Sequence, residues 1–211
     1  MIFDLDDTLV HSDAVRAAFG RVADELRVAR ARMSTLLDSL PGRPAFEIFE
    51  ALGMRRDVAR AAAGRFMSLL HDLNESVPTV AYPDAASVLE ALAESGSTLM
   101  LSTGSSPARA QKVLEQEGWD AFALVLGSDR ECVKGAEHFT AIEATVAADG
   151  AWTAQAATVG DSPRDMALGA EAGVAVRIGI ARDAEDASAL RDAGATHVVS
   201  SLADILPILA A

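Results

Sequence analysis

The segment Met1–Thr8, MIFDLDDT, joins a short apolar run directly to an acidic cluster. The run Met1–Phe3 is too short for a helix and too apolar for a surface loop, which predicts a buried strand. Asp4, Asp6 and Asp7 follow at the carboxyl end of that strand, where open parallel sheets bind their ligands. Carboxylates this close repel one another unless a cation neutralises them, and Mg²⁺ combines carboxylates with waters and phosphate oxygens. The segment therefore predicts a divalent-cation site.

Further apolar runs alternate with stretches of helical spacing along the rest of the chain. Ser106–Glu117 and Asp165–Ala172 have this spacing, and Gly118 and Gly173 follow them as C-terminal stops. Such alternation is typical of a parallel sheet with helices on both faces. The predicted fold class is α/β, with a Rossmann-like parallel sheet as its core. The later strands are expected at Thr98–Leu101, Ala123–Leu126, Ala157–Val159, Val174–Ile178 and His197–Val199.

One region, Ser12–Leu73, interrupts the alternation, because its apolar residues recur at helical spacing and it contains no strand-like run. Val77–Pro83, with two prolines, is the expected return to the core. We therefore expect a core domain formed by residues 1–11 and 78–211, and a small inserted all-helical domain formed by residues 12–77.

Composition and charge exclude several classes of protein. Half of the 211 residues are hydrophobic, which excludes a disordered chain. The 18 basic and 31 acidic side chains give a net charge of −13, which repels nucleic-acid backbones. Cys132 is the single cysteine, so no disulfide can form within the chain. No apolar stretch reaches the roughly 20 residues of a membrane span. We expect a cytoplasmic monomer or homodimer that binds neither nucleic acid nor membranes.

Polar motifs follow three of the later predicted strands as well. Ser102–Pro107, STGSSP, offers hydroxyls and backbone N–H groups at a helix start, which suits an anion and equally an ordinary helix cap. Lys134, one of only two lysines, lies in the loop after the next strand. Asp161 and Asp165 follow the strand Ala157–Val159 and would complete the metal site begun by the first strand.

The order of these motifs resembles that of the haloacid dehalogenase-like hydrolases. The motifs are Asp-x-Asp-x-Thr at Asp4–Thr8, then Thr103, then Lys134, then Gly-Asp-Ser-x-x-Asp at Gly160–Asp165. The resemblance is to members with a helical cap between the first and second motifs, such as phosphoglycolate phosphatases and β-phosphoglucomutases, and it covers nearly the whole chain. Two positions depart from the usual pattern: Asp7 stands where glycine is commonest, and Gly135 where proline is usual.

The resemblance implies a Mg²⁺-dependent phosphatase that hydrolyses a small phosphorylated metabolite through an aspartyl-phosphate. Asp4 would be the nucleophile, and Asp6 the acid that protonates the leaving oxygen and later activates water. Mg²⁺, or Mn²⁺ in its place, would be held by Asp4, the backbone carbonyl of Asp6 and Asp161, with Asp165 in support. Lys134 would orient Asp4 and neutralise charge on the transferring group.

The resemblance also implies groups that bind the substrate. Thr103, Gly104, Ser105 and Lys134 would hold the phosphate oxygens. Arg43 lies in the turn Pro41-Gly42-Arg43-Pro44, where related caps carry a specificity loop. We expect its guanidinium to contact the non-reacting part of the substrate.

Several alternatives follow from the same motifs. A dehalogenase lacks the second aspartate of the first motif, which is present as Asp6, and a phosphonatase uses a cap lysine, which residues 12–83 do not contain. A phosphomutase keeps all four motifs and is the main alternative. A receiver-type phospho-acceptor domain shares the acidic cluster, threonine and lysine, but Asp6 would hydrolyse the lasting acyl-phosphate that it needs. A homologue that only binds Mg²⁺ is the third alternative.

Overall fold

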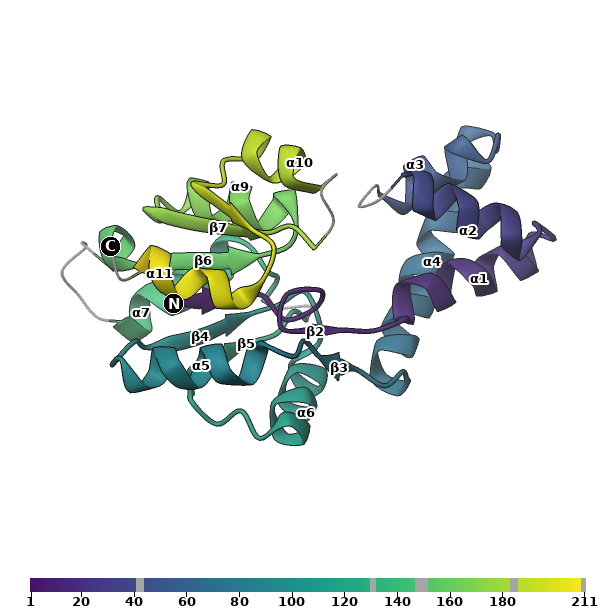
Figure 1. The fold of residues 1–211 in the computed structure, drawn as a ribbon. Helices are drawn as coiled ribbons and strands as arrows, with labels where there is room; N and C mark the ends of the chain where they lie inside the picture. The colour runs from purple at the N-terminus through teal and green to yellow at the C-terminus, as the bar shows by residue number, and fades with distance from the viewer. Residues whose placement is uncertain (41–43, 130–131, 147–151, 183–185, 210–211) are drawn as a thin grey trace. The chain divides into compact units, whose positions relative to one another are not determined.

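The six predicted strands form one parallel sheet in the order β5-β4-β1-β6-β7-β8 (Figure 1). The computed structural model describes residues 1–40, 44–129, 132–146, 152–182 and 186–209. This arrangement confirms the predicted α/β fold class. The strands are β1 (Ile2–Phe3), β4 (Leu99–Ser102), β5 (Phe122–Leu126), β6 (Ala157–Gly160), β7 (Val176–Ile180) and β8 (His197–Val199).

Helices pack on both faces of the sheet. Successive strand residues point to opposite sides, so these strands have apolar side chains on both faces. Phe3 and Leu101 belong to one buried cluster, whereas Ile2 and Met100 belong to another. The first cluster includes residues of α5 (Ala85–Glu94), α6 (Pro107–Glu117), the 3-10 turn η1 (Leu202–Asp204) and α11 (Ile205–Leu209). The second includes residues of α7 (Ala136–Val146) and α8 (Trp152–Gln155), and a further cluster joins α9 (Pro163–Glu171) to α10 (Asp186–Asp192).

The helix ends explain where the predicted boundaries hold and where they shift. Gly118 and Gly173 follow α6 and α9 with positive φ values of 69° and 76°, as expected for C-terminal stops. However, α9 begins at Pro163, two residues before the predicted start. Ser162 caps this helix, because its side chain accepts from the backbone N–H of Asp165 while the Asp165 carboxylate accepts from the backbone N–H of Ser162.

Two short strands lie in the segments that connect the sheet to the inserted region. Val10–His11 (β2) pairs with Val80–Ala81 (β3) in antiparallel register. The sequence predicts only a linker at Val77–Pro83, because a two-residue strand is too short to show a period of its own.

In the part of the inserted region that the structure describes, all regular secondary structure is helical. Its core contains the rings of Phe19, Phe49 and Phe66, with the Phe19 ring centroid 5.6 Å from that of Phe49 and 4.2 Å from that of Phe66. Aromatic pairs at these separations add to the stability gained by burial. The helices are α1 (Ala14–Glu25), α2 (Arg30–Ser39), α3 (Ala45–Ala51) and α4 (Arg56–Ser76).

By their internal contacts, the residues form two units, Met1–His11 with Thr79–Ala211 and Ser12–Pro78. That each unit folds as a separate domain stays a prediction. Among the described residues, no helix combines the length and the apolar character that crossing a membrane requires.

Candidate active site

Three carboxylates from two neighbouring strand ends meet at the carboxyl edge of the sheet. Asp4 directly follows β1, and its backbone N–H donates to Val159 O at 2.9 Å. Asp161 follows β6, and Asp165 lies in the first turn of α9. One carboxylate oxygen of each aspartate lies within 4.8 Å of the others, a separation that a single cation can bridge.

Lys134 is the cation that contacts this group of aspartates. Its Nζ donates to Oδ1 of Asp4 at 2.6 Å and also to Oδ1 of Asp165. The lysine side chain is 16% exposed. Burial lowers the pKa of Lys134, but the negative charges of Asp4 and Asp165 outweigh burial and raise the pKa above its usual value. The lysine therefore stays protonated.

One lysine does not neutralise three carboxylates. The pKa of Asp4 is raised to about 7, chiefly by burial; the charges of Asp165 and Asp6 add to the rise, and Lys134 opposes it. Burial also raises the pKa of Asp161 well above its usual value, with Asp4 and Asp165 adding to the shift. A divalent cation would favour the ionised forms of these groups, so the residues fit an oxygen-ligated metal.

The position of Asp165 is fixed by its neighbours in the chain. Its Oδ2 accepts from the backbone N–H of Ser162 at 3.1 Å and from the Ser162 hydroxyl at 2.5 Å. A Cβ atom on Gly160 would lie only 2.6 Å from Cβ of Asp165. The last residue of β6 must therefore lack a side chain for Asp165 to reach the cluster.

Thr8, the last residue of the first motif, holds Asp161, a role that the motif alone does not indicate. The buried Thr8 hydroxyl donates to Asp161 Oδ1 at 3.0 Å. Arg182 donates to the backbone carbonyl of Thr8 at 2.9 Å, and its guanidinium lies 3.6 Å from the ring centroid of Tyr82. Thr8 is thus held at both its backbone and its side chain.

The turn after Asp6 explains one departure from the usual motif. Asp7 has a φ of 58°, in the left-handed region, and its backbone N–H donates to Val10 O at 2.6 Å. Glycine adopts this conformation most readily, but aspartate is among the side chains that tolerate it. Asp7 can therefore replace glycine here.

The predicted phosphate-binding loop follows β4 and is joined to the Lys134 loop by Ser128. The hydroxyl of Ser128 donates to Thr103 O and accepts from Lys134 N, both at 2.9 Å. The Ser128 backbone N–H donates to Ser105 O at 2.7 Å. Thr103 is buried and Gly104 is exposed. Sequence motifs did not indicate Ser128, because its role depends on the path of two loops.

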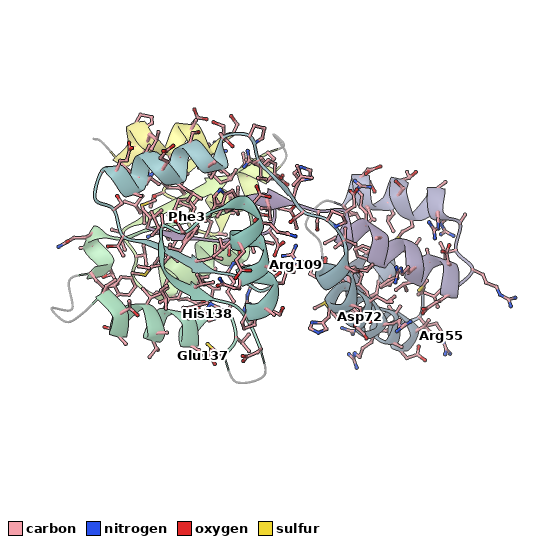
Figure 2. The ribbon with its side chains drawn as sticks, turned by 90° about the horizontal axis from the view of Figure 1, so that it is seen from below. Phe3, Arg55, Asp72, Arg109, Glu137 and His138 are labelled. Atoms are coloured by element: carbon pink, nitrogen blue, oxygen red, sulfur yellow. The ribbon has the colours of Figure 1, made fainter. Side chains whose placement is uncertain are left out.

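Asp6 is held by a different pair of side chains. Ser105 Oγ donates to Asp6 Oδ2 at 2.6 Å, and Nη2 of Arg109 lies 2.8 Å from Asp6 Oδ1. Arg109 comes from α6 and is labelled in Figure 2. The side chain of Asp6 does not belong to the group formed by Asp4, Asp161 and Asp165 in the described part of the chain. The predicted metal contact of Asp6 is through its backbone carbonyl and stays a prediction.

Two further residues, Arg43 and Ser105, are predicted to contact the substrate. Arg43 is outside the described residues, so its contact with the substrate stays a prediction. The hydroxyl of Ser105, expected on a phosphate oxygen, is directed to Asp6. The backbone N–H of Ser105 donates to Thr103 Oγ1 at 3.1 Å.

Comparisons with known proteins agree with the fold and the motif order. Residues 1–178 match the haloacid dehalogenase-like hydrolase family. The chain is 28% identical to "Probable phosphatase IndB" of Dickeya dadantii (strain 3937) over 213 residues, covering 98% of this chain and 91% of that protein.

Solved structures share the fold over almost the whole chain. The haloacid dehalogenase-like family protein SP0104 from Streptococcus pneumoniae has a TM-score of 0.71 at 22% identity and covers 98% of this chain and 96% of that chain. The "putative beta-phosphoglucomutase from Thermotoga maritima" has a TM-score of 0.64 at 19% identity and covers 99% and 97%. At these identities the likeness shows the fold alone. Because the family match spans most of the sequence, the chain belongs to the haloacid dehalogenase-like hydrolases.

Proposed function

We propose that the protein is a Mg²⁺-dependent phosphatase that hydrolyses a small phosphorylated metabolite through an aspartyl-phosphate at Asp4. The observation that supports this most is the meeting of Asp4, Asp161 and Asp165, with Lys134 paired to Asp4 and Asp165. The phosphatase name of the relative from Dickeya dadantii supports the same reaction class.

Asp4 would attack the phosphorus atom while the bond from phosphorus to the ester oxygen breaks. Asp6, in its protonated form, would give its proton to that oxygen, so that the alcohol leaves neutral. Asp6 would then take a proton from water, whose oxygen attacks the phosphorus and breaks the bond to Asp4. Phosphate is released, and both carboxyl groups return to their starting states.

Lys134 positions the nucleophile in this proposal. By donating to Asp4 Oδ1 it fixes the rotation of the carboxylate, and its charge lies where the transferring group becomes more negative. Thr103 and Gly104 would hold the phosphate oxygens, together with Lys134, whereas the Ser105 hydroxyl is directed to Asp6. Ser128 supports this function indirectly, because it joins the backbone of the Thr103 loop to that of Lys134.

A divalent cation would be held by Asp4, Asp161 and the carbonyl of Asp6, with Asp165 in support, and Mn²⁺ could replace Mg²⁺. When bound, it would neutralise negative charge and orient a phosphate oxygen. The raised pKa values of Asp4 and Asp161 support a site that needs more positive charge than Lys134 provides.

The test measures phosphate release from p-nitrophenyl phosphate with Mg²⁺ and with EDTA. The wild type should be active only with the metal, and Asp4→Asn should lose several powers of ten in kcat. Mass spectrometry of the protein during turnover should detect phosphate on Asp4. Asp120→Asn, an exposed aspartate, is the matched control and should keep full activity.

Two outcomes would contradict the proposal. Full turnover by Asp4→Asn would exclude Asp4 as nucleophile. Transfer of the phosphoryl group to a second hydroxyl of a hexose phosphate, with little free phosphate, would favour the phosphomutase alternative.

A further inference from the structure

We infer that Arg109 and Ser105 are positioning residues for Asp6, and that together they fix the carboxyl group that moves the proton during phosphoryl transfer. The role of Asp6 rests on the proposed function. The contacts that fix its orientation are independent of that function and come from the structure.

The three side chains form a closed set of contacts. Nη2 of Arg109 lies 2.8 Å from Oδ1 of Asp6, and Oγ of Ser105 lies 2.6 Å from Oδ2 of Asp6. Nη1 of Arg109 in turn donates to Oγ of Ser105 at 3.1 Å. Because an ion pair holds Oδ1 and a hydrogen bond holds Oδ2, the carboxyl group cannot rotate without breaking one of the two contacts.

Burial indicates that Arg109 serves Asp6 and not the substrate directly. The Arg109 side chain is 2% exposed, whereas that of Asp6 is 35% exposed. A guanidinium this deeply buried is costly unless it is paired, and it cannot reach a ligand in solution. Asp6 is the accessible member of the set, so it is the one that can meet the substrate.

The helix that carries Arg109 holds its backbone in place. Arg109 lies in the first turn of α6, and its N–H donates to the side chain of the N-cap residue Ser106 at 3.1 Å. A Cβ on Gly127 would lie 2.4 Å from the backbone nitrogen of Pro107, so β5 ends tightly against the start of this helix. The guanidinium therefore extends from a rigid base, as positioning requires.

The two partners of Asp6 differ in whether they can accept a hydrogen bond as well as donate one. Arg109 has only donors and can hold Oδ1 whether or not Asp6 carries a proton. The Ser105 hydroxyl donates to Oδ2 when Asp6 is ionised, and by rotating it can accept from a proton on Oδ2. Both contacts can therefore keep the Asp6 carboxyl group in one position.

The test compares two esters of nearly the same shape that differ in how much the leaving oxygen needs a proton. Phenyl phosphate depends on the general acid, whereas p-nitrophenolate leaves readily without a proton. In Arg109→Met, kcat/KM should fall about 100-fold on phenyl phosphate and less than about fivefold on p-nitrophenyl phosphate. Asp6→Asn should show the same selective loss, and Arg109→Lys should recover part of it.

Leu114→Ala is the matched control, because Leu114 is a buried residue of the same helix and belongs to the apolar cluster of Phe3 and Leu101. It should lower the Tm but leave the ratio of the two kcat/KM values unchanged. If Arg109→Met does not fold, Arg109→Lys and Ser105→Ala test the same ratio.

The outcomes separate the inference from the proposed function. Suppose that the wild type is active but Arg109→Met loses activity equally on both esters. That result would overturn the positioning role alone, and so would an unchanged ratio of the two kcat/KM values in Arg109→Lys and Ser105→Ala. If the wild type with Mg²⁺ cleaves neither ester, the proposed function is overturned, and the positioning role with it.

Discussion

Replacing Asp4 by asparagine is expected to stabilise the metal-free protein at neutral pH, although it removes the proposed nucleophile. The Asp4 side chain is 10% exposed, lies beside Asp161 and Asp165, and pairs with Lys134. Burial raises its pKa from 3.8 to about 7. Asparagine has the size of the protonated aspartate but no charge to bury, so it removes this unfavourable ionisation.

The sign and size follow from proton binding. Folded Asp4 holds its proton more tightly than unfolded Asp4, so its contribution to the free energy of unfolding is full below about pH 4 and is lost as the pH rises to about 7. The difference between 3.8 and about 7 corresponds to about 4 kcal/mol. The stability gained by Asp4→Asn should therefore rise from near zero at about pH 4 to at most about 4 kcal/mol at about pH 8.

Urea unfolding in EDTA, followed by tryptophan fluorescence at a series of pH values, measures this difference. Asp120→Asn, which changes an exposed aspartate, should follow the wild type. Mg²⁺ at about 100 times its Kd should add about 2.7 kcal/mol to the wild type at about pH 8, and clearly less to Asp4→Asn. If the stability of Asp4→Asn and of the wild type changes in parallel between about pH 4 and pH 8, the explanation from buried charge is wrong.

Three further predictions concern the same site. Phosphate release from p-nitrophenyl phosphate should stop in EDTA, return with Mg²⁺ or Mn²⁺ and be inhibited by Ca²⁺, whose longer bonds would displace Asp4; full turnover by metal-stripped protein would contradict this. Lys134→Met should lower the free energy of unfolding in EDTA at about pH 8 by about 3–5 kcal/mol, because it leaves buried carboxylates unpaired, and an unchanged urea midpoint would refute it. Gly160→Ala should cost about 1–3 kcal/mol and weaken Mg²⁺ binding in calorimetry, since the new Cβ would displace Asp165; binding as tight as in the wild type would show that Asp165 is not needed.

The sequence was sufficient to predict the sheet and the meeting of its acidic ends. Short apolar runs that end in Asp4 and Asp161 predict buried parallel strands. Parallel strands present their carboxyl ends at one edge of the sheet. The two acidic ends meet only if their strands are adjacent, and the structure shows that β1 and β6 are neighbours. Adjacent strand ends bring the two carboxylates together.

The contacts that support the site could not be predicted in the same way. Arg109 follows Asp6 by 103 positions, and no periodic pattern distinguishes an arginine that turns inward to a carboxylate from one in solvent. Ser128 and Thr8 act through hydrogen bonds whose geometry depends on the exact course of loops. Local patterns determine strands and helices, whereas these pairs depend on the packed structure.

The antiparallel pairing of β2 with β3 has a consequence for how the chain can vary. It holds the points where the chain leaves and re-enters the sheet unit, around His11 and Val80, within hydrogen-bonding distance. The entropy of closing a loop grows only with the logarithm of its length, at about 0.6 kcal/mol for each doubling. The insertion Ser12–Pro78 is about four doublings longer than a four-residue turn, so closing it costs about 2.4 kcal/mol more, a cost that the packing of its own helices offsets. Insertions of other lengths could be grafted between the same two strands without changing the register of the sheet.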